Sequence, residues 1–181
     1  IRDRNGARQN LEKEIPEWDF EGVRQEASQE WDKYLSKIDI ATKDDTHRRI
    51  FYTAMYHTAI CPNLFTDVDG RYRGMDLEIH QGDVQKPIYT IFSLWDTFRA
   101  LHPLFSIIDP QLNNDFIYSL LQKHKEGGIF PMWDLASNYT GIMIGYHAAS
   151  LIADAYTKGY SDFDLHEAYS CLLYTSPSPR D

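Results

Sequence analysis

Apolar side chains recur every three to four positions in several stretches of the chain, which is the spacing of one face of an α-helix. This spacing predicts helices over 20–38, 44–60, 93–101, 110–127 and 144–156, with one more that opens at 162–164. Asp19 is placed to cap the first helix, and Asp109 followed by Pro110 is a typical helix start. Pro62 ends the second helix, because proline cannot continue one.

Two polar, irregular stretches separate the predicted helices, at 61–92 and 129–141. The β-branched and aromatic run at 89–92 predicts a short strand within the first stretch. Loops of this length in a compact domain are usually functional or disordered, and the density of Asp, Arg and Tyr favours function. The pattern predicts an all-α fold of antiparallel helix pairs with long loops, either an α/α toroid or an α-solenoid. No repeat of fixed period is visible, which weakens the solenoid.

The domain organisation follows from where this pattern holds. Residues 1–15 are polar without a clear apolar period, so we expect a linker; the helical domain covers 16–170. The segment 171–181 is rich in Ser and Pro and breaks the pattern, and its back-translation resembles a transposase sequencing adapter. We therefore expect a non-native tail that packs against nothing; the alternative is a natural Ser/Pro-rich tail.

Composition excludes several classes of protein. The 18 Lys and Arg against 27 Asp and Glu give a net charge of −9, which argues against nucleic acid as the partner. No apolar run approaches the ~18 residues of a membrane span, and no signal-peptide pattern opens the chain. Two cysteines exclude a disulfide scaffold. Aromatic residues make up 14% of the chain, which fits a large core or a cleft that stacks rings.

Two tryptophan–aspartate pairs, Trp95-Asp96 and Trp133-Asp134, carry the candidate chemistry. An indole stacks on the C–H face of a sugar, and an adjacent carboxylate accepts hydrogen bonds from neighbouring hydroxyls. Carboxylates on two loops at one end of a helical toroid also meet the general requirement of an inverting glycosidase. The structural alternatives are a core Trp95 with Asp96 in a helix cap, and a surface loop at 133–140. Spacing alone leaves these alternatives open.

The chain offers no convincing metal site of its own. Asp67, Asp69 and Glu78 are spaced as in a calcium-binding EF-hand loop. The fifth and sixth loop positions are Arg71 and Tyr72, where that loop has an acidic residue and glycine, so the motif fails. The helical histidines lack a partner at metal-ligand spacing and are interpreted as packing residues: His57, His102 and His147.

Four segments together resemble glycoside hydrolase family 92: 51–58, 62–74, 92–100 and 143–147. The likeness covers Pro16 to Gly159. It implies a calcium-dependent, exo-acting α-mannosidase that inverts the anomeric centre, with mannose-containing glycans as partners. It also implies an upstream β-sandwich and a C-terminal (α/α)6 barrel, of which this chain is the first part. Members are usually exported, so we expect a secreted or periplasmic full-length protein.

The resemblance also implies roles for single residues. Substrate binding falls to Trp95, Asp96, Arg99 and Asp69. Asp134 is the expected general acid, at a position where family members often have Glu. Some members have Glu at the position of Tyr139, and if the acid belongs there, this chain lacks it. The general base and the calcium ligands are expected beyond Ser170, so no metal ligand is expected here.

Two alternatives to an enzyme remain at this point. A non-catalytic glycan-binding helical domain would keep Trp95 and Asp96 but need no acid. An α-solenoid that binds proteins would have exposed helix faces and short, uniform loops, and the long loops count against it.

Overall fold

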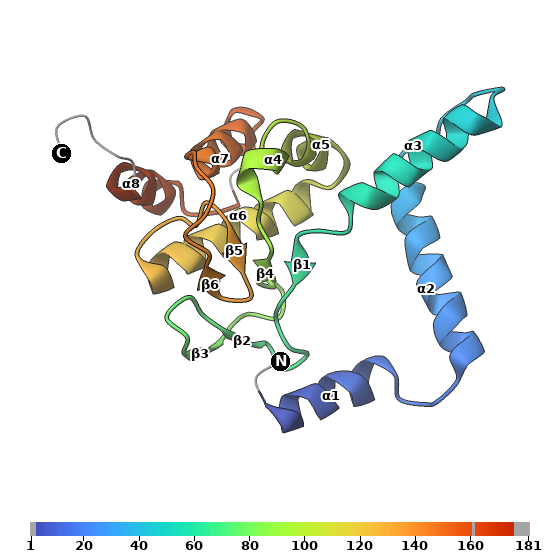
Figure 1. Cartoon of the computed structure of the whole chain (residues 1–181), viewed down its shortest axis with the longest axis horizontal. Helices are drawn as coiled ribbons and strands as arrows, with labels where there is room; N and C mark the ends of the chain where they lie inside the picture. The colour runs from blue at the N-terminus through green and yellow to red at the C-terminus, as the bar shows by residue number, and fades with distance from the viewer. Residues whose placement is uncertain (1–2, 161, 176–181) are drawn as a thin grey trace.

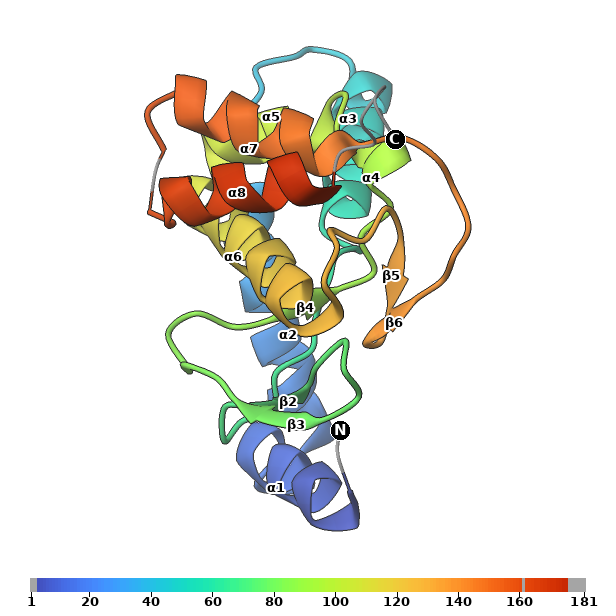
Figure 2. The same cartoon turned by 90° about the vertical axis from the view of Figure 1, so that its left-hand side faces the viewer.

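The computed structural model describes residues 3–160 and 162–175, and helices dominate these ranges (Figures 1 and 2). The helices are α1 (Arg4–Glu14), α2 (Phe20–Leu35), α3 (Asp45–Thr58), α4 (Leu94–Thr97), α5 (Leu101–Ile108), α6 (Pro110–Gly127), α7 (His147–Thr157) and α8 (Leu165–Thr175). The strands are β1 (Asn63–Leu64), β2 (Arg71–Arg73), β3 (Ile79–Gln81), β4 (Tyr89–Thr90), β5 (Asp134–Leu135) and β6 (Asn138–Tyr139). They form the antiparallel pairs β1–β4, β2–β3 and β5–β6. The predicted helical fold class is therefore confirmed.

The body of the molecule is built around α6, which packs against α5, α7 and α8. Its start follows from sequence: Asp109 accepts a hydrogen bond from the backbone N–H of Leu112, and Pro110 occupies the first turn. Its end follows from Gly128, whose φ of 79° is favourable only for glycine. The apolar side chains of these helices and of β4–α4 form one core: Phe92, Leu94, Phe105, Phe116, Ile117, Leu120, Leu121, Phe130, Ala148, Leu151, Ile152, Ala155, Ala168 and Cys171.

Helices α2 and α3 extend away from this body (Figure 1). They meet near their C-terminal ends, where the rings of Trp31 and Tyr56 lie 4.6 Å apart and the hydroxyls of Tyr34 and Thr58 share a hydrogen bond of 2.9 Å. Trp31 is 37% exposed and Phe51 is half-buried, as expected for an uncovered face. Phe116, by contrast, is fully buried, because α6 lies at the centre of the body.

Several elements differ from their predictions for local reasons. The expected linker at 1–15 contains helix α1, capped by Asp3 and joined to the body by a hydrogen bond from Asn10 to Asp67. The helix predicted over 93–101 forms only one turn, α4, and helix α5, which begins at Leu101, was not predicted. Pro103 explains the break, because it has no N–H for the carbonyl of Arg99 and its ring clashes with that carbonyl in a continuous helix.

The expectation that 171–181 packs against nothing is wrong for its first residues. Cys171 is 6% exposed and belongs to the core, and Leu172 packs against it. The hydroxyl of Tyr146 also donates a hydrogen bond to the carbonyl of Leu172. The physical reason is that Ala168, Cys171 and Leu172 continue the apolar period of α8. Residues 176–181 lie outside the described ranges.

Candidate functional site

The single-turn helix α4 presents the predicted sugar-binding residues at the surface. Leu94, 1% exposed, anchors the helix in the core, while Trp95 is half-buried and Asp96 is exposed. The hydroxyl of Ser93 donates a hydrogen bond to the Asp96 carboxylate, and the Ser93 carbonyl accepts one from the Asp96 N–H at 3.0 Å. The carboxylate is therefore held in place yet remains open to a ligand.

The indole of Trp95 is enclosed by neighbours from α4 and α7. The ring of His147 meets it edge to face at 5.4 Å and stacks on Phe98 at 4.0 Å. The guanidinium of Arg99 lies 5.5 Å from the Trp95 ring and 5.3 Å from that of Phe98, within cation–π range. Desolvation, and then the charge of Arg99, lower the pKa of His147, which favours the neutral imidazole. These contacts hold the indole rigidly beside a positive charge.

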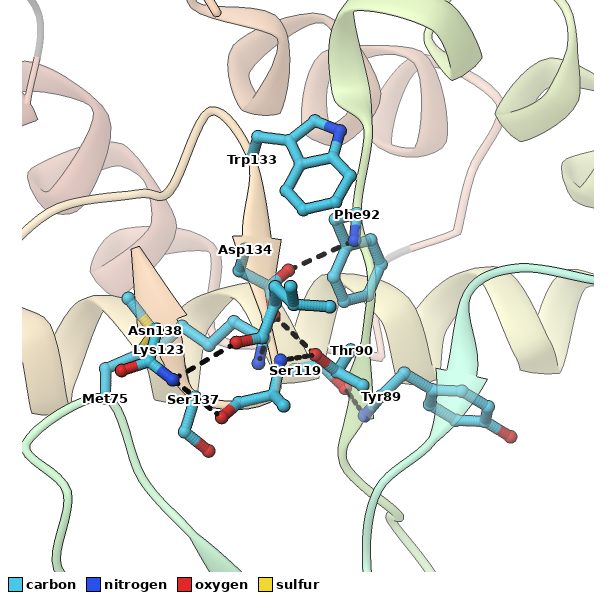
Figure 3. A network of polar contacts seen from close by, with 12 residues as sticks. Met75, Tyr89, Thr90, Phe92, Ser119, Lys123, Trp133, Asp134, Ser137 and Asn138 are labelled. Carbon is cyan, nitrogen blue, oxygen red and sulfur yellow. Dashed lines mark hydrogen bonds and ion pairs between the residues drawn. The ribbon is translucent and has the colours of Figure 1, made fainter. Parts of the chain in front are cut away.

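Asp134 occupies a different environment from Asp96, with no exposed surface (Figure 3). Its carboxylate accepts hydrogen bonds from the Thr90 hydroxyl at 2.8 Å and from the Phe92 N–H at 3.1 Å. The Nζ of Lys123, itself 2% exposed, forms an ion pair with it at 3.1 Å. A general acid has to reach the oxygen that it protonates. The burial of Asp134 therefore argues against the acid role that the sequence suggested.

The two tryptophan–aspartate motifs are joined through the backbone. Ser93 forms an isolated antiparallel bridge with Trp133, and the N–H of Ala136 donates to the Thr90 hydroxyl at 2.8 Å. The hairpin β5–β6 thus lies directly against the segment that leads from β4 into α4. The structure thus brings Asp134 close to the start of α4, the helix that carries Trp95 and Asp96.

Asp69 and Tyr139 have different positions relative to α4. Asp69 precedes β2 and accepts hydrogen bonds from the Arg71 side chain and backbone, and β2 lies at the other end of the body from α4 (Figures 1 and 2). The structure does not bring Asp69 and Trp95 together. Tyr139 is half-buried and lies opposite Asp134 in the β5–β6 pair.

Sequence reasoning did not identify Lys123 as part of the site, and it predicted Thr90 only as a residue of a short strand. One signal for Lys123 is present: it follows Phe116 and Leu120 on the apolar face of α6, where a charged side chain needs a buried partner. No local signal identifies Asp134 as that partner. Thr90 resembles an ordinary strand residue, and only the folded chain shows its hydroxyl between Ala136 and Asp134.

Two properties of the described residues bear on cofactors and membranes. No cluster of three or more His, Cys, Asp or Glu side chains within 3–160 and 162–175 is arranged to hold a metal ion. No helix in the described part of the chain has both the length and the apolar character needed to cross a membrane. A cavity of about 600 Å³ is lined by both polar and apolar residues, which include Asn10, Leu64, Asp67, Arg73 and Ala136.

Comparisons with known proteins agree on one relationship. The model of the glycosyl hydrolase family 92 catalytic domain matches residues 6–180. A family GH92 α-mannosidase from Bacteroides thetaiotaomicron, also solved in complex with mannoimidazole, is 38% identical and superimposes with TM-scores of 0.90 and 0.91, covering 96% of this chain and 23% of its own length. A family GH92 inverting mannosidase from the same bacterium is 29% identical over 94% of this chain, with a TM-score of 0.87. An uncharacterized secreted glycosidase from Arthroderma benhamiae is 29% identical over 91% of this chain, which spans 17% of that protein.

Proposed function

Because this chain belongs to glycosyl hydrolase family 92, we propose that it is a segment of an inverting, exo-acting α-mannosidase that hydrolyses terminal α-mannosides of glycans. The observation that carries the proposal is the pair of half-buried Trp95 and exposed Asp96 on α4, which Leu94 anchors in the core. The relatives support it: solved structures similar to this chain are α-mannosidases, one is titled an inverting mannosidase, and one holds mannoimidazole.

The residues of α4 have distinct proposed roles. Trp95 packs its indole against the C–H face of the terminal mannose, and Asp96 accepts hydrogen bonds from two of its hydroxyls. A charged acceptor makes these bonds about twice as strong as neutral ones. Arg99 holds the indole through its cation–π contact and places a positive charge beside the sugar. Asp69 lies at the β2 end of the body, away from α4, so we propose no contact between it and the sugar bound by Trp95 and Asp96 (Figures 1 and 2).

The remaining catalytic groups are proposed to come from other parts of the enzyme. Inversion requires an acid and a base whose carboxyl groups lie about 6.5–9.5 Å apart on opposite faces of the sugar. Asp134 is too enclosed to serve as this acid, so we place the acid elsewhere. Calcium is likewise proposed to bind outside this chain, since the described residues do not form a suitable cluster. We assign no reaction step to it.

The proposed substrates and location are consistent with each other. Mannose-rich glycans are found outside the cells that would degrade them, and a curated relative is described as secreted. We therefore propose that the full-length enzyme is exported. The acidic net charge of −9 fits an uncharged sugar substrate, which needs no cationic surface.

The test uses the full-length enzyme and the variant Asp96→Ala. The wild type should release mannose from α-mannosides, with the β-anomer appearing first in the NMR spectrum. Asp96→Ala should lower kcat/KM on every mannoside by roughly tenfold to a hundredfold. The reason is that the transition state loses at least one charged hydrogen bond, which contributes about 1.5–3 kcal/mol. Asp39→Ala is the matched control, because it removes an exposed carboxylate in the loop between α2 and α3, and it should leave activity unchanged.

Two results would contradict the proposal in different ways. A wild type that binds mannosides without hydrolysing them would indicate a non-catalytic glycan-binding protein. Full activity in Asp96→Ala would show that α4 does not form part of the sugar-binding site.

A further inference from the structure

Asp134 is a buried junction that connects its own hairpin to two other parts of the chain, the segment between β4 and α4 and helix α6. Its carboxylate contacts Thr90 in β4, Phe92 in the segment after it, and Lys123 in α6 (Figure 3). Asp134 and Lys123 are 0% and 2% exposed. A buried charge is tolerated only when it is paired and hydrogen-bonded. The carboxylate is therefore fixed in position by the most deeply packed helix of the body.

The backbone that Asp134 holds leads directly into α4. Phe92, whose N–H donates to Asp134, is fully buried and directly precedes Ser93. Ser93 pairs with Trp133 on its other side, and its hydroxyl and carbonyl both bond to Asp96. A short covalent and hydrogen-bonded path thus connects the buried carboxylate to the exposed one.

The Thr90 hydroxyl completes this connection. It donates to the Asp134 carboxylate and accepts from the N–H of Ala136 at the tip of the β5–β6 hairpin. Ala136 and Ser137 adopt left-handed backbone conformations, with φ of 46° and 69°, which cost energy for residues other than glycine. Such a turn persists only where its surroundings hold it, and the Asp134 contacts supply part of that support.

We propose that Asp134 is a positioning residue, whose carboxylate, paired with Lys123, fixes the backbone at Phe92–Ser93 and thereby orients Trp95 and Asp96 toward the terminal sugar. The proposal rests on the mannosidase function proposed above. It assigns Asp134 no contact with substrate and no proton transfer. It also gives the buried lysine of α6 a purpose in sugar recognition.

A positioning role and an acid role of Asp134 predict different losses of activity on different substrates. A missing acid affects substrates with poor leaving groups and spares activated aryl mannosides, because only the former need a proton. A misplaced Trp95–Asp96 pair weakens recognition of the terminal mannose, which both substrates share. Displacements of about 1 Å can cost as much as a hundredfold in rate.

The experiment compares two uncharged double variants of the full-length enzyme, Asp134→Asn/Lys123→Met and Asp134→Leu/Lys123→Met. Both remove the ion pair together, which leaves no unpaired buried charge and is often tolerated. Only the Asn variant keeps an oxygen that accepts the Phe92 N–H. Lys125→Met removes a partly exposed lysine of the same helix that does not contact Asp134, and it is the control for the lysine change.

Three measurements are made on each variant below its melting temperature. They are kcat/KM on a mannose disaccharide and on an aryl α-mannoside, the Kd of mannoimidazole, and hydrogen exchange of the amides in 92–97, with α7 as the reference. We expect the Asn variant to stay within about threefold of wild type. The Leu variant should lose at least about tenfold on both substrates and in mannoimidazole affinity, with faster exchange in 92–97 and unchanged exchange in α7.

The outcomes separate the claims. Equal activity, affinity and exchange in the two double variants would overturn the positioning role. A loss confined to the disaccharide would overturn it in favour of the acid role. A wild type that neither binds mannoimidazole nor hydrolyses mannosides would overturn the proposed function, while the exchange data would still decide whether Asp134 holds the segment before α4.

Discussion

His102 is the clearest case of a single residue whose chemistry is set by its surroundings. It is 2% exposed, shares a hydrogen bond of 2.9 Å with the Thr97 hydroxyl, and meets the ring of Phe116 edge to face. Burial disfavours the charged imidazole and lowers its pKa to about 4, from the ordinary 6.5. This interpretation agrees with its assignment from sequence as a packing histidine.

The lowered pKa of His102 predicts a pH dependence of stability. Between pH 6.5 and pH 4 the unfolded chain binds a proton at this residue that the folded chain excludes, so stability is complete above 6.5 and falls as the pH drops through this window. The loss is bounded by about 3 kcal/mol. His102→Gln keeps a partner for Thr97 and should reduce the fall in Tm between pH 7 and pH 4.5. The exposed His47→Gln should not, and an equal fall in both variants would contradict the assignment.

Tyr139 tests whether this chain has lost an acid. It lies opposite Asp134 in the β5–β6 pair and, unlike Asp134, is only half-buried, so a carboxyl at this position is better placed to reach a leaving-group oxygen. We predict that Tyr139→Glu raises the rate on natural linkages in the full-length enzyme and leaves activated mannosides unchanged. Tyr139→Gln is the matched control. Equal rates for Glu and Gln would mean that the acid lies elsewhere.

At the scale of elements, α6 depends on its N-cap residue, Asp109, for two different contacts. Asp109 caps the helix through the N–H of Leu112 and also forms an ion pair with Lys37, which follows α2. The ion pair is partly exposed, and such pairs contribute about 0–1 kcal/mol. The variant Asp109→Asn separates the two contacts. It keeps the cap, because asparagine caps a helix as well as aspartate does, and it removes the charge that pairs with Lys37.

We therefore predict a graded effect of Asp109 variants on the free energy of unfolding. Asp109→Asn should cost no more than about 1 kcal/mol, and its effect should vanish at high salt. Asp109→Ala should cost a further 0.5–2 kcal/mol or so, independent of salt, because the cap is lost. Urea unfolding at low and high salt measures both. Equal costs for the two variants would show that Asp109 does not act as a cap.

The elements also show where local sequence rules hold and where they stop. Asp19 and Asp109 cap the helices that their positions predicted, since capping depends only on the next few residues. The sequence analysis did not predict the break between α4 and α5, although Pro103 is a local signal for it. The β5–β6 hairpin was predicted as an irregular loop, because its turn residues, Ala136 and Ser137, are not those that favour left-handed backbone.

At the scale of the whole molecule, large apolar side chains remain exposed in two places. One is the α2–α3 arm, where Trp18 is 93% and Phe20 78% exposed. The other is a groove between α7 and α8, lined mainly by apolar side chains: Ile152, Ala153, Tyr156, Leu165, His166, Ala168, Tyr169 and Leu172. Soluble monomers rarely expose patches of this kind unless a partner covers them.

The 181-residue chain expressed alone should therefore self-associate. We predict concentration-dependent sedimentation and binding of a hydrophobic dye, both suppressed when the chain is extended by the sequence that follows it in the full-length protein. Tyr156→Lys/Tyr169→Lys, on the groove, should reduce the association. A monodisperse wild-type chain that binds no dye would contradict this prediction.

The sequence by itself determined the helical fold and the approximate limits of α2, α3, α6 and α7, because apolar periodicity and caps are properties of neighbouring residues. Tertiary structure alone decided the fate of Asp134. In sequence it looks like Asp96, a carboxylate beside a tryptophan. Lys123, Thr90 and Phe92 make it a buried anchor, and two of these lie more than 40 residues away in the chain. Whether a carboxylate faces solvent or a buried lysine depends on such long-range packing, and no local pattern records it.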